Sequence, residues 1–274
     1  MAALLAFASS VIWGTSDFFG GLLSRRRNPV AVVLLVQVFG LFFVLAWALV
    51  TNSWEFGGFW LSGFAAGVTG LAGLMLFYAA LASGTMGVVS PIAALGVVVP
   101  LSYGLLLGEQ PSSLQWMGIL TAIIGVMAAS GPELSGGVSP RPLLLAAGAA
   151  GCFGIALAFM AHGATSNATM TIVAMRIIQT LIAGIVFTAW RGFGGLQRED
   201  LPTMALVGFG DVAANVCYAL AAAIGPISIV AVLGSLPPIA TATLGAVALK
   251  ERLTVIQYGG VALAVAGVIA LNAG

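Results

Sequence analysis

The sequence predicts an all-α integral membrane protein in which ten transmembrane helices form two inverted repeats of five helices. Hydrophobic residues make up 61% of the 274 residues and charged residues only 6%, whereas about a quarter of the residues in a soluble chain are charged. Apolar runs close to the ~20 residues that span a bilayer recur from end to end. One hairpin pattern also appears twice, which indicates an internal duplication.

The duplicated pattern covers residues 107–125 and recurs 142 positions later at residues 249–267. Each copy contains a hydroxyl residue followed three positions later by Gln, the pattern of a capping box that satisfies free N–H groups at a helix start. Small residues at helical spacing then line one face. The matched residues are Ser112, Gln115, Gly118, Ala122 and Gly125 in the first copy and Thr254, Gln257, Gly260, Ala264 and Gly267 in the second. The match in register predicts two halves of equal architecture.

We expect five spans on each side of one linker. The spans cover residues 2–23, 29–50, 58–82, 86–107, 113–131, 142–162, 168–190, 202–223, 226–249 and 254–272. The Gly/Ser/Pro-rich stretch around residues 130–142 is the one linker-like composition. The predicted units are therefore a first repeat at 1–131, a linker at 132–141 and a second repeat at 142–274. An odd number of spans per half inverts the second repeat, an arrangement typical of secondary transporters with a site near the midplane.

The basic residues predict an orientation in the cell (inner or plasma) membrane. Apart from Arg176, every Lys and Arg falls on the side opposite the termini: Arg25, Arg26, Arg27, Arg141, Arg191, Arg198, Lys250 and Arg252. Positive residues favour the cytoplasm. This bias predicts a multi-pass protein with both termini outside the cell.

Three charged residues within predicted spans are candidates for function, because a charge at mid-bilayer costs ~2.5–3.5 kcal/mol and usually faces a protein interior or a cavity. Asp211 lies mid-span, and Asn215 and Tyr218 follow on the same helical face. This stripe serves either a cavity or coupling function, or an internal bridge that fixes packing. Asp17, one turn after Trp13, either lines a cavity mouth or reaches the headgroups.

Arg176 has three possible functions. It can pair with Asp211 or Asp17 as a structural bridge, bind an anionic substrate group such as a carboxylate, or extend to the membrane interface. The lone histidine, His162, falls at a span end, where solvation is the main expectation and proton shuttling the alternative.

Prolines predict matching interruptions in the two halves. Pro91 and Pro100 fall in span 86–107, and Pro237 and Pro238 fall in span 226–249. Each removes a helical hydrogen bond and kinks or breaks its helix. Interrupted helices at matching positions indicate a transporter site, and a static bend that aids packing is the alternative.

Several functions are excluded or disfavoured by absences in the sequence. There is no P-loop, HExxH, GxSxG or Cys/His metal spacing, so we expect no enzyme activity, no catalytic residues, no metal and no cofactor. The formal charge of +1 argues against a nucleic-acid partner.

The whole chain resembles the EamA family of the drug/metabolite transporter (DMT) superfamily. The resemblance is carried by Ile12-Trp13-Gly14, by Gly108-Glu109 after the proline-bearing span, and by the segment from Lys250 to Thr254, together with Gln257 and the repeated glycines. It implies a pseudo-symmetric basket around a central cavity, with the fifth and tenth spans as peripheral scaffold. On that mapping the cavity residues are Trp13, Tyr78, Phe153, Asp211, Asn215 and Tyr218.

The resemblance implies a secondary active transporter that moves small metabolites, such as amino acids or related compounds, by alternating access and in the direction of export. The expected partners are a small-molecule substrate and the lipid bilayer, with protons as the candidate coupling ion and a monomer or a homodimer as the assembly. The alternative is a membrane-embedded enzyme or scaffold acting on lipid-linked substrates. The chain departs from the family in lacking basic residues at 51–60 and in placing Gln37 in span 2 and Arg176 in span 7. We interpret both departures as signs of an inverted membrane orientation.

Overall fold

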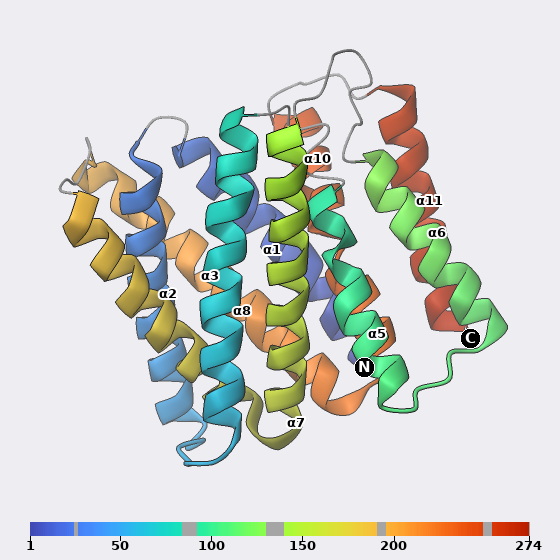
Figure 1. Ribbon diagram of the computed structural model, residues 1–274, viewed down its shortest axis with the longest axis horizontal. Coiled ribbons are helices and arrows are strands. Elements are labelled where there is room, and N and C mark those ends of the chain that lie inside the picture. Colours follow the sequence, from blue (N-terminus) through green and yellow to red (C-terminus); the bar gives the residue numbers. More distant parts are fainter. Residues whose placement is uncertain (25–26, 84–91, 130–139, 191–195, 249–253, 274) are drawn as a thin grey trace.

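The computed structural model describes residues 1–24, 27–83, 92–129, 140–190, 196–248 and 254–273, and this part of the chain consists of helices joined by short connections. The helices run side by side across the molecule (Figure 1). They are α1 (Ala2–Ser24), α2 (Pro29–Val50), α3 (Phe59–Ser83), α5 (Val98–Leu106), α6 (Ser113–Ala129), α7 (Pro140–Trp190), α8 (Leu201–Ile224), α9 (Ile227–Gly234), α10 (Pro237–Ala248) and α11 (Val255–Ala273), with 3-10 turns η1 (Leu95–Val97) and η2 (Arg198–Asp200).

These helices do not correspond one to one with the ten predicted spans. Helix α7 covers two predicted spans, whereas α9 and α10 share one. Within the described residues, five helical segments are long and apolar enough to cross a membrane, and the other apolar helices are shorter. The all-α membrane class therefore stands, and the exact count of ten spanning helices stays a prediction.

Asn167 divides α7 into two arms, residues 140–166 and 168–190. Its backbone is extended (φ −153°, ψ 99°) within an otherwise helical element. The side-chain oxygen accepts a hydrogen bond from the N–H of Met170 (3.0 Å), which caps the second arm. The side-chain amide donates to the carbonyl of Ser53 (3.2 Å) and to Glu55 (3.3 Å), which fixes the turn to the α2–α3 connection. Both arms then pack on α3, the first at Gly73 and the second at Gly63.

The packing of α6 on α11 is reciprocal. A Cβ at Gly118 would meet Leu271, and one at Gly260 would meet Ala129, which are equivalent contacts at the repeat spacing. A Cβ at Gly125 would likewise meet Ala264, and one at Gly267 would meet Ala122. Such exchange of equivalent residues is the signature of a two-fold axis. Because the start of one helix meets the end of the other, the two helices are antiparallel, as inverted repeats require.

Both predicted capping boxes are confirmed at the starts of these two helices. The side chain of Gln115 accepts from the N–H of Ser112 (2.8 Å), and the hydroxyl of Ser112 accepts from the N–H of Gln115 (3.2 Å). Thr254 and Gln257 make the same exchange at 2.8 and 3.3 Å. The repeated residues thus perform the same local function in each half.

The remaining helices pack mainly across the two halves. Helix α1 lies on α8, where a Cβ at Gly210 would meet Ser16 and one at Gly20 would meet Val207. Helix α2 packs on both α7 and α8. The centre of the molecule is therefore an interface between the two halves, and polar side chains of both can meet there.

Orientation can be tested directly. Figure 1 shows both termini toward the lower side of the view, and α1 runs from there toward the upper side; beyond its end, Arg27 forms an ion pair with Asp200 (2.8 Å). Because the basic edge should face the cytoplasm, a C-terminal alkaline phosphatase fusion should be active and a C-terminal green fluorescent protein fusion dark. The opposite pair of results would show that the termini are cytoplasmic.

The two adjacent glycines of α11 give a matched test of the α6–α11 contact. A Cβ at Gly260 would lie 2.2 Å from the backbone N of Ala129, whereas one at Gly259 would meet nothing within 4 Å. We expect Gly260→Ala to lower the stability of the detergent-solubilised protein by about 1–3 kcal/mol through overpacking, and Gly259→Ala to leave it unchanged or slightly raised. Thermal unfolding checks both. Equal midpoints for the two variants would contradict the reciprocal packing.

Candidate functional site

A buried guanidinium forms the centre of the candidate site. Arg176 lies on the second arm of α7 and is only 1% exposed. Its Nη1 donates to the side-chain oxygen of Gln37 on α2, and its Nη2 donates to Oδ2 of Asp211 on α8 at 2.5 Å. A charge in this position is tolerated only when it is paired, so Asp211 and Gln37 determine where Arg176 can lie.

Both carboxylate oxygens of Asp211 accept hydrogen bonds. Besides the ion pair at Oδ2, its Oδ1 accepts from the indole Nε1 of Trp13 (2.9 Å) and from the amide of Asn215 (3.2 Å). Trp13 belongs to α1 and Asn215 to α8. The charged cluster, which we define as Trp13, Gln37, Arg176, Asp211 and Asn215, therefore joins α1, α2, α7 and α8.

Of the three options for Arg176, this geometry shows the pairing with Asp211. Each of its two Nη atoms has a hydrogen-bond partner, and its side chain is 2% exposed. In this structure the guanidinium forms a bridge inside the protein. Its Nε is buried and has no partner among the described residues.

Tyr218 extends the polar face of α8 beyond the cluster. Its ring is fully buried and lies 5.8 Å, centroid to centroid, from the ring of Trp13. A Cβ at Gly234 of α9 would come within 2.7 Å of the same ring. Within the described part of the chain, the phenol oxygen has no hydrogen-bond partner.

Asp17 stands one turn from Trp13 on α1 and outside the cluster's hydrogen bonds. Its side chain is exposed, and among the described residues no hydrogen bond or ion pair reaches its carboxylate.

The other predicted site residues are not part of the charged cluster or fall outside the described residues. Phe153 packs against Gly73 and Phe77 of α3, 6.1 Å from the Phe77 ring. Tyr78 belongs to α3, but its side chain falls outside the described part, as does Pro91 altogether. Pro100 is buried in the first turn of α5, directly after the 3-10 turn η1.

The helix that contains Pro237 and Pro238 is interrupted. Helix α9 ends at Gly234, and α10 begins at Pro237. Helix α1 donates one hydrogen bond to α9, before the break, and accepts one from α10, after it. The hydroxyl of Ser10 donates to the carbonyl of Leu233, and that of Thr241 donates to the carbonyl of Gly14 at 2.9 Å. Polar support of this kind is what permits a broken helix inside a membrane.

Glu109 and Gln37 are functional candidates that the sequence reasoning did not assign to the site. Glu109 follows Gly108, whose positive φ of 91° ends α5. Its two oxygens accept from the N–H groups of Ile227 (2.5 Å) and Ser228 (2.8 Å), so it caps α9 of the other repeat. The signals in the sequence were an acid at the same place in both copies of the hairpin, and a lone amide in the otherwise apolar α2.

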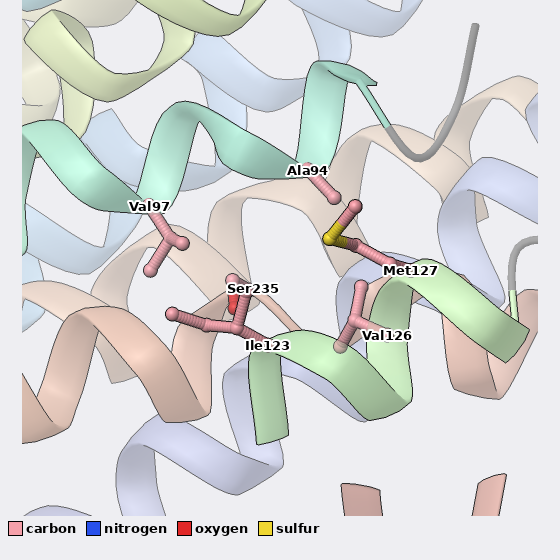
Figure 2. Close-up of a pocket in the computed structure, with 6 residues that line it drawn as sticks. All are labelled: Ala94, Val97, Ile123, Val126, Met127 and Ser235. Atoms are coloured by element: carbon pink, nitrogen blue, oxygen red, sulfur yellow. The ribbon is translucent and has the colours of Figure 1, made fainter. Parts of the chain in front are cut away.

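Figure 2 shows a small pocket beside the helix break. Its lining residues are Ala94, Val97, Ile123, Val126, Met127 and Ser235. The one polar side chain among them, Ser235, already donates to the carbonyl of Val232 at 2.8 Å. This pocket offers apolar contact only, so we do not assign it to substrate recognition.

The ion pair predicts a non-additive pair of variants. Arg176→Met leaves Asp211 without its cation inside the protein, and we expect a loss of stability of about 3 kcal/mol. Adding Asp211→Asn removes the unpaired charge and should restore part of that loss. Thermal unfolding of both single variants and the double variant in detergent measures the coupling. Strictly additive losses would show that the two charges do not depend on each other.

Comparisons with known proteins agree with this architecture. The sequence model of the EamA-like transporter family matches residues 1–131 and 140–273. One solved structure, described only as "Crystal structure of protein", superposes with a TM-score of 0.81 over 98% of this chain and 95% of its own, at 18% identity. At that identity the likeness shows the fold alone. The comparison with curated proteins found no match. The chain is therefore a multi-pass membrane protein that belongs to the EamA-like transporter family of the drug/metabolite transporter superfamily.

Proposed function

We propose that this protein is a secondary active transporter that exports a small metabolite, of the class of amino acids or related compounds, across the cytoplasmic membrane by alternating access. The observation that carries the proposal is the charged cluster, in which Arg176 and Asp211 of one repeat bind Gln37 and Trp13 of the other. Paired charges held between two inverted repeats near the membrane midplane are typical of a transport site.

The polar contacts between the repeats also supply parts for alternating access. The cluster, the supports of the broken helix and the Glu109 cap all join the first repeat to the second. Rocking of one repeat against the other would break these contacts together and form new ones. On the edge that carries the termini, Glu109 holds the end of α5 on the start of α9, so opening there requires breaking two charge-assisted hydrogen bonds.

A metabolite profile tests the proposal. We would express the wild type, Asp211→Asn and the control Glu199→Gln, at an exposed carboxylate, in a host that lacks its own exporters, and quantify metabolites in cells and medium. We expect the wild type and the control to move one compound class outward, and Asp211→Asn to lose at least about tenfold of that flux, because the cluster loses its ion pair.

Each other outcome has a defined meaning. Equal flux in all three strains would leave transport standing and make Asp211 structural. No flux in any strain, with normal insertion, would contradict transport and favour an enzyme or scaffold acting on lipid-linked substrates.

In a background with Cys152 and Cys217 replaced by Ala, cross-linking Glu109→Cys to Pro226→Cys should stop the flux reversibly. Continued flux would contradict alternating access at that edge.

A further inference from the structure

Arg27 joins the two repeats beyond the end of α1, on the side of the molecule away from the termini. Its Nε lies 2.8 Å from Oδ2 of Asp200, and its Nη2 donates to the side-chain oxygen of Gln197 at 2.9 Å. Nη2 also lies 3.4 Å from Oδ1 of Asp200. Arg27 belongs to the first repeat, whereas Gln197 and Asp200 belong to the second. One guanidinium therefore connects the repeats at this edge, which we call the basic edge.

The two partners of Arg27 are fixed in front of it. The N–H of Gln197 donates to Oδ2 of Asp200 at 2.8 Å, and the N–H of Asp200 donates to the carbonyl of Gln197 at 3.0 Å. The side chains of Arg27 and Asp200 are 22% and 12% exposed, so the ion pair is largely shielded from water. A fixed carboxylate and amide oxygen suit the planar fork of a guanidinium. Because both partners lie in the turn from which α8 begins, movement of α8 away from α1 breaks these bonds.

Below this ion pair, α1 and α8 stay in contact as far as the charged cluster. One turn before the end of α1, a Cβ at Gly20 would lie 3.5 Å from Cγ1 of Val207, whose side chain is buried. Deeper in the bundle, a Cβ at Gly210 would meet the hydroxyl of Ser16. The indole hydrogen bond of the charged cluster follows and again joins α1 to α8. The α1–α8 contact thus extends from Arg27 at the basic edge to the centre of the molecule.

The α1–α8 contact can separate more easily than the α6–α11 contact. At Gly20 and Gly210, an added Cβ would meet side-chain atoms of the other helix, which can change rotamer. At Gly125 and Gly260, it would meet backbone atoms, which cannot. Separation of α1 from α8 at the basic edge therefore requires the release of Arg27 and no displacement of closely packed backbone.

The two edges of the molecule are held together by different chemistry. At the edge that carries the termini, Glu109 of the first repeat accepts hydrogen bonds from N–H groups at the start of α9. At the basic edge, two side chains of opposite charge meet. Attraction between two charges close to the surface weakens at high salt. The contact at the basic edge should therefore respond to salt, which a contact made by packing alone would not do.

We propose that Arg27 is the gate residue of the basic edge, and that the protein opens toward this side when Arg27 releases Asp200 and α1 separates from α8. The proposal rests on the transport function proposed above and assigns to Arg27 the part that Glu109 has at the other edge. Both contacts are formed together in this structure. Transport then requires that they break in turn, so that the two edges do not open at the same time.

A thiol placed below the ion pair reports on opening. In a background with both cysteines replaced by Ala, we would introduce Val207→Cys and measure how fast a polyethylene glycol maleimide labels it in the detergent-solubilised protein. Arg27→Gln should raise the labelling rate about two- to fivefold, the range for loss of one partly exposed ion pair. Arg27→Lys keeps the charge and should raise the rate less. The control Glu199→Gln, at an exposed carboxylate of η2, should leave it unchanged.

Salt and a double variant separate the ion pair from other effects of the substitutions. Raising NaCl from about 0.1 M to about 1 M should speed labelling when Arg27 is present and not in Arg27→Gln. Asp200→Asn should also raise the rate, and combining it with Arg27→Gln should add little further. A second reporter, Ser228→Cys, replaces a fully buried residue at the start of α9, at the opposite edge. Its labelling should not rise in Arg27→Gln.

Four labelling results would overturn the proposal. They are an unchanged rate in Arg27→Gln, no effect of salt, strictly additive effects of Arg27→Gln and Asp200→Asn, and faster labelling of both reporters, which would indicate general loosening of the bundle.

The metabolite profile separates failure of the gate from failure of transport. Arg27→Gln should lower the outward flux at least about twofold, and Arg27→Lys should restore part of it. If the wild type exports a compound and Arg27→Gln alters labelling but not flux, the ion pair holds α1 on α8 without gating, so the assignment is wrong while transport stands. If nothing is exported, the transport function itself is wrong, and the gate assignment falls with it.

Discussion

A guanidinium buried in the middle of an apolar helix bundle needs a negative partner, because it is not hydrated there. In this protein that constraint falls on Arg176 and Asp211, and it fixes the positions of four helices. Gln37 on α2 binds Arg176 and Trp13 on α1 binds Asp211, so side chains of both repeats stabilise the ion pair. Any movement between the repeats has to preserve or replace these bonds.

The contact between α6 and α11 differs from the charged cluster in that small side chains and backbone form it, with equivalent residues exchanged across a local two-fold axis. Close backbone approach supplies dispersion where lipid removes the hydrophobic drive for helix association. Such a contact has little tolerance for displacement, since even one methyl group would clash with backbone atoms. It suits a fixed scaffold, whereas the polar contacts in the centre suit rearrangement.

The broken helix α9–α10 depends on groups from the other repeat. A helix start needs partners for its free N–H groups, and Glu109 provides them at Ile227 and Ser228. The break itself is supported by hydroxyls that bond backbone carbonyls across α1 and α10. Among the described residues, the Nε of Arg176 and the phenol oxygen of Tyr218 are buried without a hydrogen-bond partner.

The sequence by itself determined the membrane class, the duplication and the two capping boxes, because composition and short spacings are local properties of the chain. It also identified Asp211, Asn215 and Arg176, since polar residues are conspicuous in apolar spans. Only the tertiary structure decided what these residues bind. The bonds of Arg176 to Gln37, of Trp13 to Asp211 and of Glu109 to α9 join residues more than 100 positions apart. It likewise placed Phe153 against α3. Which polar groups pair in the centre depends on how the two repeats dock, and no local pattern in the chain encodes that docking.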